Sequence, residues 1–152
     1  MSRLIKPLVL LGIGGLTYVG IELLYRGYTH WTMFFVGGLC FVILGLLNEY
    51  RYNWNMALLK QALIGAVTIT GFEFVSGCIV NLWLKWNVWD YSDLPFNLYG
   101  QICLYYFLLW IPLSIIGIML DDWIRYVVYL ALHKTFPGMQ KRERPHYRLL
   151  KA

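Results

Sequence analysis

The chain has 152 residues, of which 59% are hydrophobic and only 14% are charged. Soluble domains carry about 25% charged residues, so this composition excludes an ordinary water-soluble protein and favours one that is dissolved in lipid. The formal net charge of +5 comes from Lys and Arg at the edges of apolar runs and near the C-terminus. That placement favours anionic lipid headgroups over nucleic acid as partners.

Four apolar runs follow one another along the chain, at residues 8–25, 32–47, 56–84 and 98–120. A helix needs ~20 apolar residues to cross a hydrocarbon core about 30 Å thick, so each run predicts one membrane-spanning helix. The first run ends in Tyr25-Arg26-Gly27 rather than in a small-residue cleavage site, and we expect it to be retained as a span. The third run is longer than one crossing requires, and its buried part is expected at 62–82.

Charged residues at 121–125 interrupt the hydrophobicity after the fourth run. The apolar stretch that follows, at 126–132, is too short to cross again, so it predicts either an interfacial helix or an extension of the fourth helix. We therefore expect an all-α polytopic membrane protein with four transmembrane helices in one domain, residues 1–138. A basic cytoplasmic tail, residues 139–152, is expected to contact anionic lipids.

The Lys and Arg residues indicate the orientation of the chain in the membrane. With the N-terminus inside, 11 of them lie on the inner side and only Arg26 and Lys85 lie outside. Because positively charged flanks are retained in the cytoplasm, this split predicts that both termini are cytoplasmic. The split requires an even number of crossings.

One acidic residue lies deep in an apolar run. Glu73 belongs to a stripe of mostly small residues whose spacings of four and three place them on one helix face: Ala62, Ala66, Thr70, Glu73 and Gly77. Small residues let membrane helices approach closely, so this face is expected to pack against another helix. A carboxylate at this depth costs about 2.5–3.5 kcal/mol and usually serves a purpose. Two interpretations remain open, a ligand or ion site and a hydrogen-bonding strut between helices.

Further polar and aromatic residues gather at the outer side. Glu22 and Arg26 are four residues apart on the first helix and are expected to pair, following Gly12 and Gly15 on one stripe. The loop before the fourth run carries aromatic residues beside polar ones, namely Trp86, Trp89, Tyr91, Asp90 and Asn97. Our hypothesis is that this loop covers an outward-opening polar cavity with Glu73 at its floor and Glu22 at its rim. The alternative is a loop that caps the fourth helix and forms an aromatic belt.

Three segments carry a resemblance to a known family. They are WDYSDLPFNLYGQICL at 89–104, GFEF at 71–74 with the following Gly77, and YVGIELLYR at 18–26. Together they resemble the type IV ABC-transporter family of bacterial membrane proteins, the CmpB-like proteins. The resemblance implies a transport-related protein of the bacterial inner membrane. The Gly-rich segment at 12–15 lacks the Lys-Ser/Thr of a phosphate-binding loop, so ATP-driven activity would need a separate ATPase subunit.

The sequence thus favours a transporter or channel subunit that handles a cation, a proton or a small polar solute at a site centred on Glu73. Residues Glu22, Arg26, Asp90 and Asn97 are expected to contribute to that site. Four helices enclose little volume, so a homo-oligomer or a partner membrane subunit is expected. The alternative is a non-transporting assembly or regulatory subunit that docks partner helices. We expect no catalytic site, metal or cofactor, because no nucleophile elbow, His-Glu-x-x-His motif or His cluster is present. The acidic pair Glu22 and Glu73 keeps an intramembrane enzyme that acts on lipid or peptide open as a third alternative.

Overall fold

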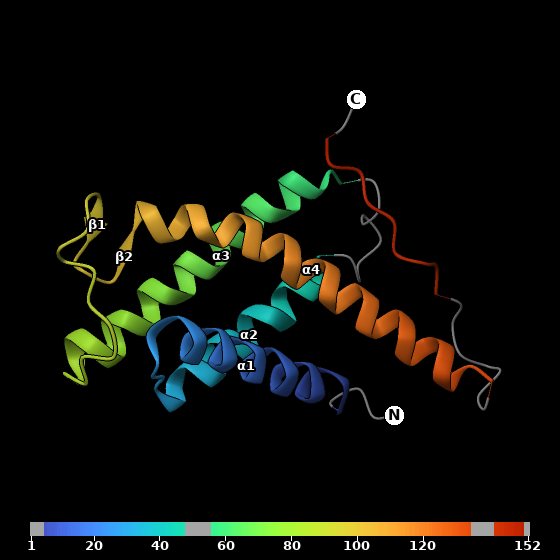
Figure 1. Ribbon diagram of the computed structural model, residues 1–152, viewed down its shortest axis with the longest axis horizontal. Helices are drawn as coiled ribbons and strands as arrows, with labels where there is room; N and C mark the ends of the chain where they lie inside the picture. The colour runs from blue at the N-terminus through green and yellow to red at the C-terminus, as the bar shows by residue number, and fades with distance from the viewer. Residues whose placement is uncertain (1–4, 48–55, 135–141, 151–152) are drawn as a thin grey trace.

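The computed structural model describes residues 5–47, 56–134 and 142–150, and these form an all-α protein, as predicted. The elements, in chain order, are α1 (Ile5–Arg26), α2 (Trp31–Leu46), α3 (Leu58–Gly77), the π-helix η1 (Cys78–Trp83), β1 (Asn97–Leu98), β2 (Ile102–Cys103) and α4 (Leu104–Leu132). Figure 1 shows that consecutive helices run in alternating directions along the long axis of the molecule. The α1–α2 turn and the β1–β2 hairpin therefore lie at one end, and the start of α1 and the end of α4 lie at the other.

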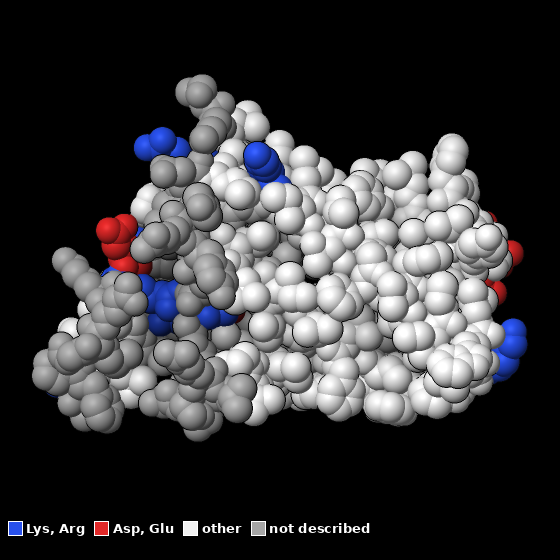
Figure 2. All heavy atoms as spheres, turned by 180° about the vertical axis from the view of Figure 1, so that it is seen from behind, with Lys and Arg blue, Asp and Glu red and all other residues white. Residues whose placement is uncertain are grey.

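Three apolar helical stretches are long enough to cross a membrane: Pro7–Arg26, Leu58–Trp83 and Leu104–Leu132. The apolar helix α2 has 16 residues, which rise about 24 Å. Figure 2 shows Lys, Arg, Asp and Glu at the two ends of one face, separated by a broad band that contains none of them. This arrangement matches a bundle whose middle faces hydrocarbon.

The helices α1 and α2 pack against each other through glycines. A Cβ atom added to Gly38 would lie 2.5 Å from the Leu11 carbonyl oxygen, so only glycine permits this approach of the two backbones. Gly14 and Gly15 likewise face α2, whereas at Gly12 no atom of the described residues lies within 4 Å of the place a Cβ would occupy. The predicted first stripe was therefore wrong at Gly12, because α1 is rotated so that Gly14 takes its place at the contact.

The helices α3 and α4 pack along the predicted stripe of small residues. Ala62 and Ala66 are completely buried, and Glu73 is only 4% exposed. This confirms that the stripe forms one inward face of α3. The main core cluster lies where α2, α3 and α4 meet and includes Leu44, Ala66, Ile69, Trp110 and Ile118.

The fourth helix begins later than its apolar run. The run begins at Leu98, but α4 begins at Leu104 because a hairpin pairs Asn97 with Cys103 and Leu98 with Ile102. Of the three residues between the strands, Tyr99 and Gly100 have positive φ, which is the backbone geometry of a tight hairpin turn. At its other end α4 continues without interruption to Leu132, so the apolar segment that follows the charged residues is a helix extension.

The C-terminal segment lies against the end of the bundle where α3 begins. The backbone N–H of Leu58 donates to the Arg148 carbonyl oxygen at 2.7 Å, and the Tyr147 hydroxyl donates to Asp122 at 3.1 Å. These contacts satisfy part of the free N-terminus of α3. Arg3, Arg51, Lys141 and Lys151, which contribute to the predicted orientation, lie outside the described residues, as does part of the predicted tail.

Candidate functional site around Glu73

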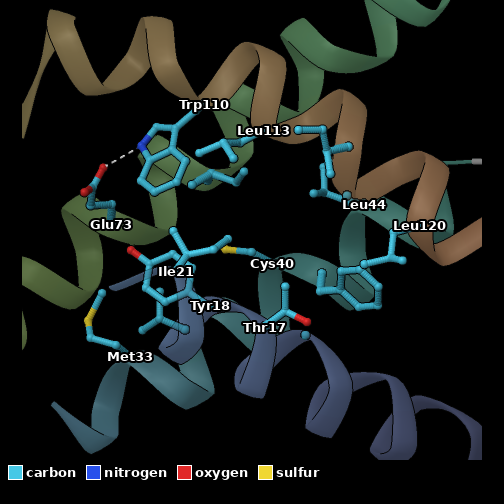
Figure 3. A pocket seen from close by; sticks show the side chains of 17 residues that line it. Thr17, Tyr18, Ile21, Met33, Cys40, Leu44, Glu73, Trp110, Leu113 and Leu120 are labelled. Atoms are coloured by element: carbon cyan, nitrogen blue, oxygen red, sulfur yellow. Dashed lines mark hydrogen bonds between the residues drawn. The ribbon is translucent and has the colours of Figure 1, made fainter. Parts of the chain in front are cut away.

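Glu73 is held by two neutral hydrogen-bond donors from different parts of the chain. The Tyr91 hydroxyl, in the loop before α4, donates to Glu73 Oε1 at 2.9 Å. The Trp110 indole N–H, on α4, donates to Glu73 Oε2 at 3.0 Å, as drawn in Figure 3. The carboxyl group therefore points into the protein, as the stripe of small residues predicted.

These two hydrogen bonds reduce the cost of placing a carboxylate inside the membrane. That cost is about 2.5–3.5 kcal/mol on insertion scales. A hydrogen bond to a charged group contributes about 1.5–3 kcal/mol, so two of them are of the same size as the cost. A carboxylate has about four acceptor positions, and Tyr91 and Trp110 use two. Glu73 therefore retains capacity to accept from a ligand.

A cavity of about 110 Å³ lies beside Glu73 and is lined by residues of α1, α2, α3 and α4 (Figure 3). Glu73 is the one charged side chain among the described residues that line it, and the other lining side chains are mainly aliphatic or aromatic. The rings of Tyr18 and Trp110 stack at its Glu73 end, with centroids 6.1 Å apart. The expectation of a polar cavity was wrong, because the helix faces that meet here contribute Leu, Ile, Val and Met rather than polar residues.

Glu22 and Arg26 form the predicted pair on α1 but do not line this cavity. The Thr29 hydroxyl also donates to Glu22, and the Arg26 guanidinium donates to the Val88 carbonyl oxygen at 3.5 Å. Glu22 is 7% exposed, so its carboxylate is buried near the C-terminal end of α1. It ties α1 to the loop before α4 rather than forming the rim of a cavity.

Asp90 and Asn97 shape turns within the loop. Asp90 Oδ1 accepts from the Ser92 backbone N–H at 2.9 Å and from the Ser92 hydroxyl, and these bonds hold the pKa of the exposed Asp90 below its usual value. The Asn97 side chain donates to the carbonyl oxygens of Ser92 and Leu94. The predicted cap on α4 was wrong, since its N-cap residue is Cys103, whose side chain makes no capping hydrogen bond.

The three aromatic residues of the loop occupy different surroundings. Trp86 is 45% exposed and contacts the rings of His30 and Trp31, as an aromatic belt residue would. Trp89 is only 6% exposed and packs in a cluster beneath the loop. Tyr91 stacks on Tyr106 with ring centroids 4.5 Å apart, and burial, followed by the neighbouring Glu73 carboxylate, raises the pKa of its hydroxyl well above the usual value. Tyr91 therefore remains a hydrogen-bond donor to Glu73 across the physiological pH range.

A second buried network, which the sequence reasoning missed, fixes the loop over the site. The Asn81 amide on η1 donates to Gln101 Oε1 at 2.8 Å, while its Oδ1 accepts from the Val88 backbone N–H at 2.7 Å. The Trp89 indole N–H donates to the Gln101 carbonyl oxygen at 2.9 Å. The signal available in the sequence was that Asn81 and Gln101 are amide residues at the margins of apolar runs. Because this loop carries Tyr91, the network also positions one of the two donors to Glu73.

The described residues do not gather three His, Cys, Asp or Glu side chains in a group that could hold a metal ion. The groups that donate to Glu73 are instead a phenol and an indole. The arrangement can bind a positively charged or hydrogen-bond-donating group at the carboxylate, next to an apolar space.

Comparison with known proteins identifies the family. The family model described as "Putative ABC-transporter type IV" matches residues 9–137. The chain belongs to this family. No curated protein and no solved structure matches it. The match runs from α1 through α4, so it covers the Glu73 site and the loop above it. The fold and the apolar helices of this type IV ABC-transporter family member are those of an integral membrane protein.

Proposed function

We propose that this chain is the membrane subunit of a transporter or channel, and that it binds a cation, a proton or a small polar solute through Glu73. One observation carries the proposal: a buried carboxylate with two neutral donors and unused acceptor positions faces a cavity at mid-bundle. Glu73 lies ten residues before the end of η1, about 15 Å along the helix axis, which is half the thickness of a hydrocarbon core. Membership of a transporter-associated family supports the same function.

In the proposed orientation all four helices cross the bacterial inner membrane, with both termini in the cytoplasm. The loop that carries Tyr91 then covers Glu73 from the outside. Lys85 is near this loop, whereas Lys134 and Arg144 are near the opposite end of α4. The proposal includes a homo-oligomer or a partner subunit, which would supply both the remaining volume of a pathway and, for ATP-driven transport, the ATPase. Residues of the C-terminal tail would contact anionic lipid headgroups. The proposed function involves no catalytic step.

The test is solute or ion flux in proteoliposomes for the wild type and the Glu73→Gln variant. The substitution preserves the shape of the side chain and removes its charge, so we expect flux to fall at least tenfold. Asp93→Asn is the matched control, because it neutralises an exposed carboxylate of the outer loop, and flux should stay within about twofold of the wild type. Unchanged flux in a folded Glu73→Gln protein would remove the basis of the proposal.

A second candidate is an assembly subunit that docks partner helices. Part of the predicted docking stripe is used within the bundle, because Ala66 is fully buried. At Gly12, Gly20 and Gly71, the part of the chain that the structure describes places no atom within 4 Å of where a Cβ would lie, so it does not use these small-residue positions of α1 and α3 for packing. Cysteines at these positions should crosslink to a different membrane protein if the chain is an assembly subunit. Isolation as a monomer without crosslinks would count against this candidate.

A further inference from the structure

The cavity beside Glu73 opens sideways toward the membrane. α1 packs mainly on α2 and α3 mainly on α4, so α1 and α4 form two facing walls with α2 behind them (Figures 1 and 3). The cavity is lined by Ile21 of α1, which is 41% exposed, and by Ile116 and Leu120 of α4, which are 60% and 37% exposed. Lining residues that are exposed on the apolar surface place the mouth of the cavity within the hydrocarbon region. A ligand can therefore enter from the bilayer.

The size and lining of the cavity restrict its occupant. Its volume is about 110 Å³. For comparison, a cavity of about 150 Å³ lined by Leu, Ile and Phe binds benzene. Transfer of a polar group into an apolar lining without a hydrogen bond costs roughly 1–3 kcal/mol or more, which disfavours sugars and hydrated ions. The body of the occupant must therefore be small and apolar.

The Glu73 end of the cavity requires a different chemistry. A carboxylate with free acceptor positions binds a charged N–H group with a strong, charge-assisted hydrogen bond. The stacked rings of Tyr18 and Trp110 line the same end, and aromatic faces attract ammonium groups. A purely hydrocarbon ligand would leave the remaining acceptor positions of Glu73 unused.

We propose that the cavity binds a small amphipathic organic ammonium, which enters between α1 and α4 and places its nitrogen on Glu73 and its apolar body against Cys40 and Leu113. The inference rests on the proposed function and names its substrate class. It also assigns a function to the apolar lining, which a proton or inorganic cation would not need.

The test measures binding of benzylammonium and of benzyl alcohol to the full chain in nanodiscs, by calorimetry with empty nanodiscs subtracted. The two probes have nearly the same shape and differ in charge. We expect benzylammonium to bind at least tenfold more tightly, and we expect Glu73→Gln to reduce this preference to less than about twofold while benzyl alcohol still binds. Equal affinities in the wild type, or an unchanged preference in Glu73→Gln, would overturn the inference.

A substitution that fills the cavity tests where the apolar body of the ligand lies. Cys40 lines the cavity, whereas the neighbouring Leu39 lies outside it and is 39% exposed. Cys40→Phe should weaken both probes at least tenfold, and the matched control Leu39→Phe should leave both within about twofold. If Cys40→Phe does not fold, Thr17→Phe at the exposed mouth takes its place. Unchanged binding in the folded variant would place the ligand elsewhere and contradict the proposal.

The two proposals fail in different ways. Suppose that flux depends on Glu73 but the wild type does not prefer benzylammonium to benzyl alcohol. The proposed organic ammonium substrate is then wrong, and the transported species is a proton or an inorganic cation. If benzylammonium binds as described but Glu73→Gln leaves flux unchanged, the site is real and the transport function is wrong.

Discussion

Glu73 links α3 to two other parts of the chain, because one of its carboxylate oxygens accepts from α4 and the other from the loop above. Its inward direction was predictable from the spacing of Ala62, Ala66 and Gly77. Its partners were not, since Tyr91 and Trp110 lie 18 and 37 positions away in the chain and meet Glu73 only after the helices have packed. Trp110 lies in the fourth apolar run, but nothing in the sequence distinguishes a packing indole from one that donates.

Trp110→Phe removes a donor to Glu73 and keeps an aromatic ring in the core. We expect this variant to lose about 1–2 kcal/mol of unfolding free energy, measured by titration with a denaturing detergent in mixed micelles. Trp83→Phe, at a 77% exposed position, is the control and should change stability by less than about 0.5 kcal/mol. Equal losses in the two variants would show that the indole N–H has no special role.

The lowered pKa of Asp90 makes the stability of the loop before α4 depend on pH. Because its pKa is lowered in the folded protein, the stabilisation it gives the loop is present above the pKa of an unfolded Asp and is lost as the pH falls through the folded value. Ser92→Ala removes the hydroxyl donor and should raise the Asp90 pKa toward its usual value. NMR titration of the Asp90 side chain measures its pKa in the wild type and in Ser92→Ala, and identical values would contradict this account.

At the scale of elements, the close packing of α1 on α2 depends on glycine. In Gly38→Ala the new Cβ would meet the Leu11 carbonyl oxygen at 2.5 Å, so we expect a loss of about 1–3 kcal/mol of unfolding free energy. In Gly12→Ala the new Cβ would meet no atom of residues 5–47, 56–134 or 142–150 within 4 Å. This variant should be neutral or stabilising by up to about 1 kcal/mol, since Ala favours a helix over Gly. The same detergent titration compares them, and similar stabilities would refute the packing described.

Helix type and number were predictable because long apolar runs dominate this chain, but two helix boundaries were not. The apolar residues at 98–103 allow either a helix or a strand, and the hairpin forms because Tyr99 and Gly100 adopt positive φ. The π-helix at η1 was also not predictable, since its extra residue per turn leaves no signal in an apolar sequence such as Cys78–Trp83. Both features lie around the loop that covers Glu73, so the candidate site was less predictable than the bundle.

At the scale of the whole molecule, the short helix α2 decides the number of crossings. Cysteines at Tyr28 and Asp93, both exposed, should react with an impermeant maleimide from the same side of the membrane, and a cysteine at Lys134 should react from the other side. This result requires α2 to cross, because α2 and α3 separate the first two positions. The experiment uses a background without Cys40, Cys78 and Cys103. Labelling of Tyr28→Cys and Asp93→Cys from opposite sides would contradict four crossings.

The central claim is that the bundle shelters the Glu73 carboxyl group and holds it by hydrogen bonds. Solid-state NMR of the chain in lipid bilayers, with ¹³C-labelled Glu and ¹⁵N-labelled Trp indole, measures this contact directly. We expect a through-space correlation between the Glu73 carboxyl carbon and the Trp110 Nε1, lost in Glu73→Gln and in Trp110→Phe. Absence of the correlation, with a Glu73 carboxyl signal that Trp110→Phe does not shift, would mean that the carboxyl group faces the acyl chains and would contradict the account.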